Sequence, residues 1–128
     1  MTMPHIGVYC KLAPSPIHGV GVFALVDIPK DTDLFGPDTT NLILIAPSDV
    51  DKLPPSYKQL YQDFAVLHDG WWHCPPSFNH MTNAWYLNHS DTPNVVCIID
   101  DYAFISLRDI VVGEELLVDY NTYSEQGI

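Results

Sequence analysis

Short apolar runs that end at prolines or acidic residues constrain the fold of this chain more than any other feature. Residues 22–28 and 42–45 are β-branched or apolar, and they stop at Pro29 and Pro47. Proline has no backbone N–H to give to a sheet, so each run is expected to end there. Both segments therefore predict short β-strands.

The last third of the chain repeats this pattern. Residues 95–99 and 102–107 flank Asp100-Asp101, and such an acidic pair is typical of a tight hairpin turn. Residues 116–118 form a further short apolar run. Together with the first two runs, these segments predict a mainly β protein.

Helical periodicity is confined to the middle of the sequence. Residues 57–64 carry apolar side chains at every third or fourth position, and Ser56 is expected to cap this helix. Ser48 together with Asp51 is expected to cap a shorter turn before it. Residues 69–83 are rich in Gly, Pro and Asn and are expected to be irregular.

A weak internal similarity relates two segments with the same order of features. Residues 27–35 and residues 109–117 each read as a strand, an acidic turn and a second strand. A stacked repeat protein needs about three copies of its unit, so a solenoid is not expected. The similarity instead predicts one supersecondary unit that is used twice.

Composition limits the classes of partner. At 128 residues the chain fits a single domain, residues 1–128, with a packed core. Sixteen acidic residues against five basic ones give a net charge of −11, which repels nucleic acid and favours a basic peptide or protein. The same charge can also serve solubility alone.

The cysteines and the N-terminus indicate the compartment. Cys10, Cys74 and Cys97 are odd in number and lack C-x-x-C spacing, and no basic segment followed by an apolar one opens the chain. No apolar run approaches the roughly 20 residues that span a membrane. A soluble intracellular protein is expected, either cytoplasmic or, if it acts on chromatin, nuclear.

A glycine pair near the front admits more than one interpretation. His18 to Ala24 fits the pattern G-x-G-x-x-A. A dinucleotide-binding fingerprint would need a strand before this pattern and a helix after it, and neither flank predicts one. The glycines can instead form a sharp turn that brings main-chain groups close to a ligand, or an ordinary turn.

Two polar motifs in the last third of the chain resemble the walls of a site. Residues 88–94 read NHSDTPN, and residues 113–120 read GEELLVDY. The order of a G-x-G turn, NHSxxPN and GEELxxDY resembles the signature of the SET domain. The chain is similar to a minimal protein-lysine methyltransferase of that family, with residues from about 46 to 81 as the family's variable insert.

This resemblance implies a β-clip fold of several small twisted sheets, with a short helical insert and a C-terminal segment that is threaded as a pseudoknot. It also implies S-adenosylmethionine as the cofactor. The residues expected to hold this cofactor lie in the glycine turn and in the NHS motif: His18, Gly19, Val20, Gly21, Asn88 and His89.

Tyr120 is expected, by the same resemblance, to lie beside the transferring methyl group. Methyl transfer to an amine is a direct displacement, so it requires an aligned neutral nitrogen more than a covalent nucleophile. A sulfonium and an aromatic channel both disfavour the ammonium form, so no strong base is needed. The alternative is a core tyrosine with a satisfied hydroxyl.

The resemblance further implies a channel for the lysine side chain. Tyr123 is expected to form one wall, and Tyr86 with Trp85 can supply aromatic bulk. Cys97 stands where the family often has an aromatic residue, so a wide channel is expected and the degree of methylation stays open. With the acidic composition, a basic tail such as one on a histone or ribosomal protein is the expected substrate.

Other residues of the motifs are expected to be structural. Ser90, Asn94 and Glu115 would tie the knotted segments together by hydrogen bonds. The chain lacks the cysteine-rich zinc tail of many relatives, so no metal is expected. Tyr123, the second subunit of a homodimer or the bound peptide would then have to close the pockets.

Alternative classes of protein are a metal-binding module and a domain of this family that only binds a peptide or cofactor. His68, His73, Cys74 and His80 prompt the first, although their spacing matches no common zinc pattern. The tyrosine at position 120 argues against the second.

Overall fold

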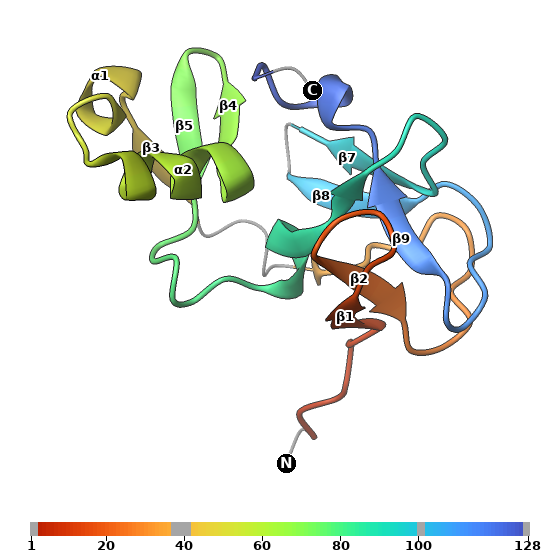
Figure 1. Cartoon of the computed structure of the whole chain (residues 1–128). Coiled ribbons are helices and arrows are strands. Elements are labelled where there is room, and N and C mark those ends of the chain that lie inside the picture. Colours follow the sequence, from red (N-terminus) through yellow and green to blue (C-terminus); the bar gives the residue numbers. More distant parts are fainter. Residues whose placement is uncertain (1–2, 37–41, 100–101, 127–128) are drawn as a thin grey trace.

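The computed structural model describes residues 3–36, 42–99 and 102–126. The chain is mainly β, as predicted (Figure 1). Its strands are β1 (Cys10–Pro14), β2 (Val20–Ala24), β3 (Ile43–Ile45), β4 (Val66–His68), β5 (Trp71–Cys74), β6 (Asn88–His89), β7 (Val95–Ile98), β8 (Ala103–Ser106) and β9 (Glu115–Val118). The helices are α1 (Pro47–Val50) and α2 (Pro55–Phe64), with short 3-10 helices η2 (Asn83–Tyr86) and η3 (Tyr120–Thr122).

The larger sheet has β9 at its centre. Its strand order is β1-β2-β9-β7-β8, and β6 also pairs with β9. Val22 of β2 and Leu116 and Val118 of β9 are 0% exposed, so these strands carry the middle of the main core. β6 and β7 both run parallel to β9, which brings the NHS motif and the last strand side by side. The threading of a pseudoknot stays a prediction.

The segment from β3 to β5 forms a separate lobe, which we call the insert lobe (Figure 1). It contains α1, α2 and the small sheet β3-β5-β4. Its own apolar cluster is made of Val50, Ala65, Trp72 and Cys74. The lobe overlaps the predicted insert of residues 46–81, and the assignment of this segment as the family's variable insert stays a prediction.

The two similar segments meet at one bridge outside the named strands. Ile28 donates its N–H to the carbonyl of Ile110 at 2.7 Å, and Ile110 donates back to Ile28 at 2.8 Å. Ile28 and Ile110 form an antiparallel bridge between the two segments, and beyond it residues 31–34 bond to residues 104–106 while residues 113–116 bond to residues 22–24. The unit that was predicted to occur twice forms the two equivalent halves of one local arrangement.

The side chains of the two halves make reciprocal bonds. The carboxylate of Asp27 accepts the N–H of Val112 at 2.9 Å, and the carboxylate of Asp109 accepts the N–H of Lys30 at 2.9 Å. Asp27 and Asp109 occupy equivalent positions, as do Lys30 and Val112. Such an exchange is what a local two-fold arrangement requires.

The expected helix caps are wrong. α2 begins after Pro54, with Pro55 in its first position, and no side chain caps it, so Ser56 already lies inside the helix. The fixed φ of proline suits the first helical turn, where its missing N–H costs nothing. α1 likewise follows Ala46 without a side-chain cap from Ser48 or Asp51. None of the described helices has the length and apolar character of a membrane span.

The expectation of irregular structure over residues 69–83 is also wrong at its start. β5 pairs with both β3 and β4. Asp69 and Gly70 have φ values of 55° and 76° and join β4 to β5. An Asp-Gly pair between apolar runs is a strong hairpin signal, and it was available in the sequence.

Strand β1 stands where no strand was expected. It forms a hairpin with β2, in register from Cys10 with Ala24 to Pro14 with Val20. A second strand, and no helix, follows the glycine turn, so the pattern still lacks the helix of a dinucleotide fold. β2 ends at Ala24, before the expected limit of residue 28, and the expected turn at residues 100–101 lies outside the described residues.

Candidate functional site

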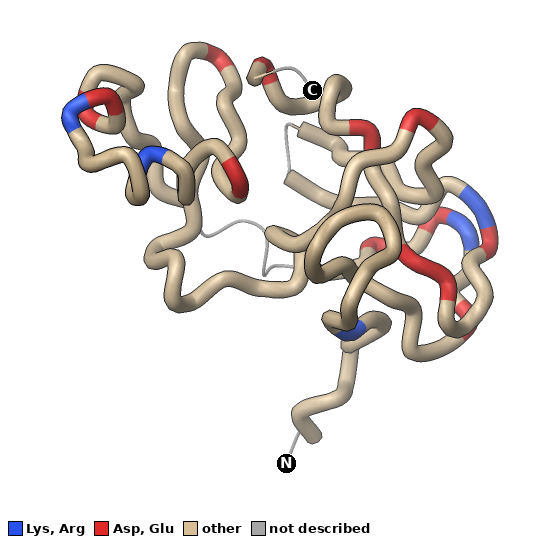
Figure 2. The backbone as a smooth tube through the Cα atoms, viewed as in Figure 1, with Lys and Arg blue, Asp and Glu red and all other residues tan. Residues whose placement is uncertain are grey.

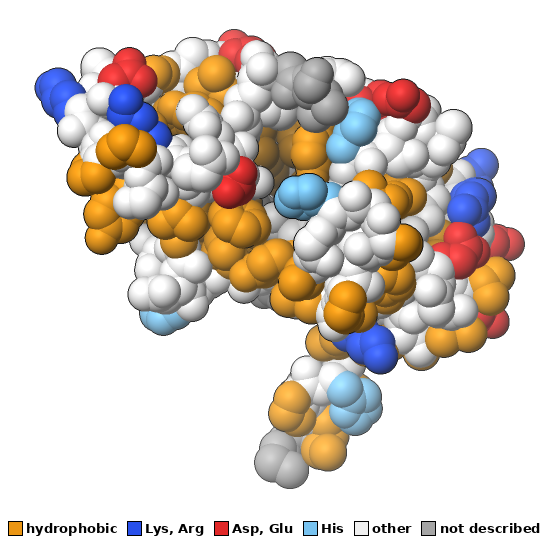
Figure 3. All heavy atoms as spheres, viewed as in Figure 1, with side chains coloured by type: hydrophobic (Ala, Val, Ile, Leu, Met, Phe, Trp, Pro, Cys, Tyr) orange, Lys and Arg blue, Asp and Glu red, His pale blue; other side chains and the backbone are white. Residues whose placement is uncertain are grey.

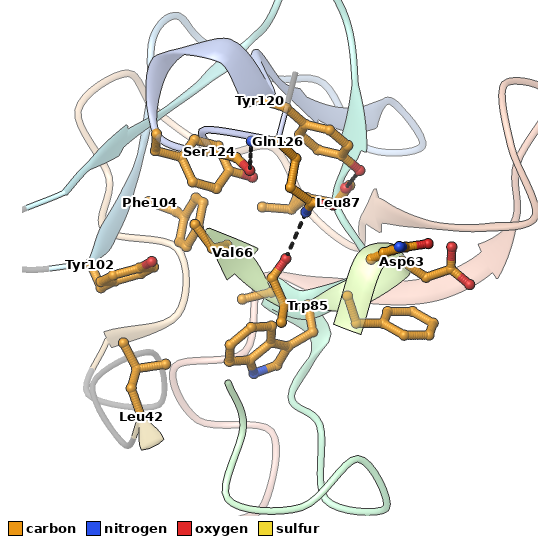
Figure 4. A pocket seen from close by; sticks show the side chains of 15 residues that line it. Leu42, Asp63, Val66, Trp85, Leu87, Tyr102, Phe104, Tyr120, Ser124 and Gln126 are labelled. Atoms are coloured by element: carbon orange, nitrogen blue, oxygen red, sulfur yellow. Dashed lines mark hydrogen bonds between the residues drawn. The ribbon is translucent and has the colours of Figure 1, made fainter. Parts of the chain in front are cut away.

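Cavities of different character lie between the insert lobe and the larger sheet, where Figure 3 shows hydrophobic side chains gathered in a hollow. The larger, which we call the loop cavity, has a volume of about 560 Å³. The smaller, the aromatic cavity, has a volume of about 190 Å³ (Figure 4). Residues that line both are Gln62, Asp63, Phe64, Trp85, Leu87 and Tyr120. The two spaces therefore share a wall that includes Tyr120.

The turn between β1 and β2 lines the loop cavity through Ile17, His18, Gly19 and Val20. The positive φ of Gly19, 47°, lets the chain reverse, and Ser15 donates its N–H to the carbonyl of Gly19 at 2.8 Å. The main-chain groups that were predicted to approach a ligand thus lie beside a cavity.

A buried amide holds this turn against the last strand. Asn88 is 5% exposed, and its Nδ2 donates to the carbonyl of His18 at 2.9 Å and to Oε2 of Glu115 at 2.9 Å. The hydroxyl of Ser15 donates to the same carboxylate at 2.9 Å. Both amide hydrogens of Asn88 are therefore used in positioning the turn.

Gly21 does not line the loop cavity. A Cβ atom at this position would lie 2.2 Å from Oε2 of Glu115, so the glycine makes room for the carboxylate that bonds Asn88. Gly21, which was expected to contact the cofactor, thus has a packing role beneath the turn.

We expect Gly21→Ala to lower the free energy of unfolding by about 2 kcal/mol, because overpacking of this size costs about 1–3 kcal/mol. Urea denaturation measures the change. The variant Glu115→Asp shortens the opposing side chain, so the double variant should lose less than the sum of the single losses. Additive losses would show that Gly21 and Glu115 do not compete for the same space.

His89 and Tyr120 meet through the pairing of β6 with β9. Tyr120 donates its backbone N–H to Nδ1 of His89 at 3.1 Å, and the two rings lie 5.3 Å apart. Because Nδ1 accepts this bond, the ring proton of the neutral imidazole lies on Nε2, which is 3.1 Å from Oδ1 of Asp91. The loop cavity is lined by Asn88, His89 and Tyr120 together.

Tyr120 lies at the boundary of the two cavities with its hydroxyl bonded. The phenol donates to the carbonyl of Leu87. Burial, and secondarily the charge of Glu115, raise the pKa of Tyr120 to about 12. At neutral pH the side chain is therefore a neutral phenol, which can orient and polarise a ligand but cannot act as a base.

The aromatic cavity has walls from distant parts of the chain. Trp85, Tyr102, Phe104, Tyr120 and Tyr123 line it, together with Leu42. Figure 4 shows Tyr120 and Tyr102 at different ends of this space. Burial raises the pKa of Tyr123 well above its ordinary value, so its hydroxyl is also neutral.

Other residues predicted for the channel lie elsewhere. Cys97 is 7% exposed and lines neither cavity, and burial raises the pKa of its thiol to about 12. Its partner across the hairpin, Phe104, lines the aromatic cavity instead. Tyr86 lines the loop cavity, where its ring packs 5.6 Å from that of Phe64. A hairpin centred on residues 100–101 places position 104 opposite position 97, so Phe104 could have been predicted.

The chain itself covers one side of the aromatic cavity after η3. Ser124 and Gln126 line the cavity. Gln126 donates its Nε2 to the carbonyl of Ala65 at 3.1 Å, and Glu125 donates its N–H to the carbonyl of Leu67 at 2.6 Å. Tyr123 was one of the expected means of closing the pockets, and Tyr123 and its neighbours lie at this wall.

The structural ties expected within the motifs are present for Asn94 and Glu115. Asn94 accepts the N–H of Leu117 at 2.7 Å and donates to the carbonyl of Glu115 at 2.9 Å. The backbone N–H of Ser90 donates to the carbonyl of Val118, whereas its hydroxyl contacts Thr92. The NHS motif is therefore bonded along β9.

The hydroxyl of Tyr102 is a buried polar atom that has no hydrogen-bond partner among the described residues. We expect Tyr102→Phe to raise the free energy of unfolding by about 1 kcal/mol, since an unsatisfied buried hydroxyl costs about 1–3 kcal/mol. Thermal and urea denaturation measure this change, with the exposed Tyr57→Phe as the control. A loss of stability would mean that the hydroxyl is satisfied in the folded protein.

The residues that prompted a metal-binding module do not form a ligand set. Within residues 3–36, 42–99 and 102–126, no three His, Cys, Asp or Glu side chains are placed to hold a metal ion. The ring of His73 contacts the carbonyl of His68 at 3.1 Å, and Cys74 is buried in the insert lobe.

Comparisons with known proteins agree with this arrangement. The family model of the SET domain matches residues 19–121. A crystal structure of a Plasmodium falciparum protein, provisionally assigned as a histone methyltransferase, has 18% sequence identity and a TM-score of 0.59. The likeness covers 88% of this chain and 93% of that chain, and it shows a shared fold. No curated protein matches the sequence closely enough to count as a relative.

Proposed function

The chain belongs to the SET-domain family, and from this premise we propose that it transfers a methyl group from S-adenosylmethionine to the side-chain amine of a lysine in a basic protein or peptide. The observation that carries the proposal is the position of Tyr120. Its side chain lines both the loop cavity and the aromatic cavity, so a donor in one and an acceptor in the other would meet beside its phenol.

The loop cavity suits the cofactor in volume and in lining. Its volume of about 560 Å³ lies in the range of small-molecule sites. The turn of residues 17–20 supplies backbone groups, while Phe64, Trp85 and Tyr86 supply aromatic surface for a nucleoside base. S-adenosylmethionine would contribute a methyl group made electrophilic by its sulfonium.

The aromatic cavity suits the stem of a lysine. Its aromatic walls can pack on four methylene groups, and rings of Trp and Tyr attract a cation at their faces. Removal of the amine from water also disfavours its charged form. The cavity thus favours the neutral nitrogen that methyl transfer requires, without a dedicated base.

Each residue around the junction then has a role in positioning. Tyr120 presents a neutral hydroxyl that is oriented by its bond to Leu87. His89 fixes the backbone of Tyr120, and Asn88 fixes the turn of the loop cavity. Preorganised dipoles of this kind stabilise developing charge without reorganisation.

A basic substrate is favoured by the charge of the molecule. The net charge of −11 is spread over the insert lobe and the larger sheet, and Asp and Glu outnumber Lys and Arg on the chain (Figure 2). Such a field attracts cationic tails and speeds their association. We propose a tail of the kind found on histones or ribosomal proteins.

Transfer of labelled methyl groups tests the proposal. The protein is incubated with methyl-labelled S-adenosylmethionine and a panel of basic peptides, each paired with a peptide in which arginine replaces every lysine. We expect label in the lysine peptides alone, and tandem mass spectrometry should place it on the side-chain amine. Cofactor binding without transfer to any peptide or protein would favour a domain that has kept binding and lost catalysis.

A further inference from the structure

Asp63 is an exposed, charged residue that lies at the boundary of both cavities. Among the described residues that line the aromatic cavity, it alone carries a carboxylate or a basic group. It also lines the loop cavity. Figure 4 shows Asp63 toward the end of the aromatic cavity at which Tyr120 and Leu87 lie, and away from Leu42 and Tyr102.

The position of Asp63 is unfavourable for the helix that carries it. Asp63 lies in the last turn of α2, where unpaired carbonyls give the helix end a negative charge, and that turn holds no basic residue. Its carboxylate accepts a bond from Nε2 of Gln59 at 2.8 Å, and none of the ion pairs between described residues includes it. A local electrostatic cost of this kind is common at functional sites.

Nearby backbone acceptors are already engaged. The carbonyl of Leu87 accepts the hydroxyl of Tyr120, and the carbonyl of Ala65 accepts Nε2 of Gln126. The carboxylate of Asp63 keeps further acceptor sites after its bond to Gln59. It is therefore well suited to receive a cation that enters the aromatic cavity.

We propose that the carboxylate of Asp63 receives the ammonium group of the substrate lysine where the aromatic cavity meets the loop cavity. This inference rests on the proposed function and deepens it, because it assigns substrate recognition to a residue of the insert lobe, outside the NHS and GEEL motifs. Asp63 is a positioning residue for the amine in its charged form at the boundary of the cavity, where the attraction of the carboxylate opposes the desolvation that favours the neutral amine deeper between the aromatic walls. The proton is lost to water before the methyl group is transferred.

The probe for this contact is n-butylammonium, which reproduces the lysine side chain, with 1-butanol as its uncharged counterpart. Asp63→Asn keeps an oxygen acceptor for Gln59 and removes the charge. Asp51→Asn removes the same charge from an exposed position of the insert lobe that lines neither cavity. Binding to the whole protein is followed by the NMR signals of cavity side chains such as the Trp85 indole.

We expect Asp63→Asn to weaken n-butylammonium binding about threefold at low salt, as the loss of one exposed charge pair does. Binding of 1-butanol and the effect of Asp51→Asn should show no such change. Salt should weaken binding to the parent protein more than binding to Asp63→Asn. Equal binding of n-butylammonium to parent and variant, or no binding to the parent, overturns the assignment.

A second arm separates the lysine from the ammonium group of the cofactor. S-adenosylhomocysteine carries that group, and 5′-methylthioadenosine lacks it. If Asp63→Asn weakens only S-adenosylhomocysteine, the carboxylate serves the cofactor and the inference is overturned. Methyl transfer by the parent with no effect of Asp63→Asn would sink this inference alone, whereas absence of transfer by the parent would sink the proposed function as well.

Discussion

Tyr120→Phe is expected to lower kcat for methyl transfer by about 10²–10³-fold, the usual effect of removing one preorganised hydrogen-bonding group from an active site. The phenol of Tyr120 is partly buried, bonded to Leu87 and shared by both cavities. Phenylalanine keeps the ring that packs 5.3 Å from His89, so the shape of the cavities should be preserved.

The effect should appear in kcat, with little change in cofactor affinity. Steady-state transfer kinetics and calorimetric titration with S-adenosylhomocysteine measure the two quantities. Tyr57→Phe, which removes an exposed hydroxyl from α2, is the matched control. Because the pKa of Tyr120 is raised to about 12, kcat should not rise with formation of a phenolate between pH 7 and pH 10. Full activity in a folded Tyr120→Phe variant would remove Tyr120 from the mechanism.

Asn88→Ala is expected to have the second largest effect, on both stability and cofactor binding. The substitution removes the buried amide that donates to the carbonyl of His18 and to the carboxylate of Glu115, both in part-buried bonds, and leaves Ser15 as the remaining side-chain donor described for that carboxylate. Leaving a hydrogen-bonding group without its partner costs about 1–3 kcal/mol, and because the two partners are only part-buried, a loss of about 2 kcal/mol in unfolding free energy is expected.

The same change should release the turn that lines the loop cavity. We expect the dissociation constant of S-adenosylhomocysteine to rise at least tenfold, which corresponds to about 1.4 kcal/mol. Asn79→Ala, at an exposed position outside both cavities, is the control for loss of an asparagine. A variant with normal cofactor affinity and reduced stability would mean that Asn88 supports the fold alone.

The sequence predicted those parts of the fold that follow from local patterns and from family motifs. The apolar runs before Pro47 and after the NHS motif are strands β3 and β7. The similarity of residues 27–35 and 109–117 corresponds to reciprocal pairing, because the same local bonds are made in each half. β1 was missed because its residues Cys10–Pro14 include Lys and end in Pro, and only its pairing with β2 makes the strand clear.

The site was predictable where it depends on the chain motifs and not where it depends on the insert lobe. The NHS motif and Tyr120 meet because β6 pairs with β9, as the resemblance implied. Asp63 and Phe64 reach the cavities only through the way α2 packs, which no spacing in the sequence specifies. Gly21 fits the family pattern, yet its role beneath Glu115 depends on an atomic distance.

In the proposed mechanism, a methyl donor in the loop cavity points its methyl group at Tyr120. The most direct measurement is an isotope-filtered nuclear Overhauser experiment on the protein with S-adenosylmethionine that carries a ¹³C-labelled methyl group. We expect cross-peaks from this methyl group to the ring of Tyr120 and to the side chain of Leu87. A bound cofactor whose methyl group shows contacts elsewhere and none to Tyr120 would contradict this mechanism.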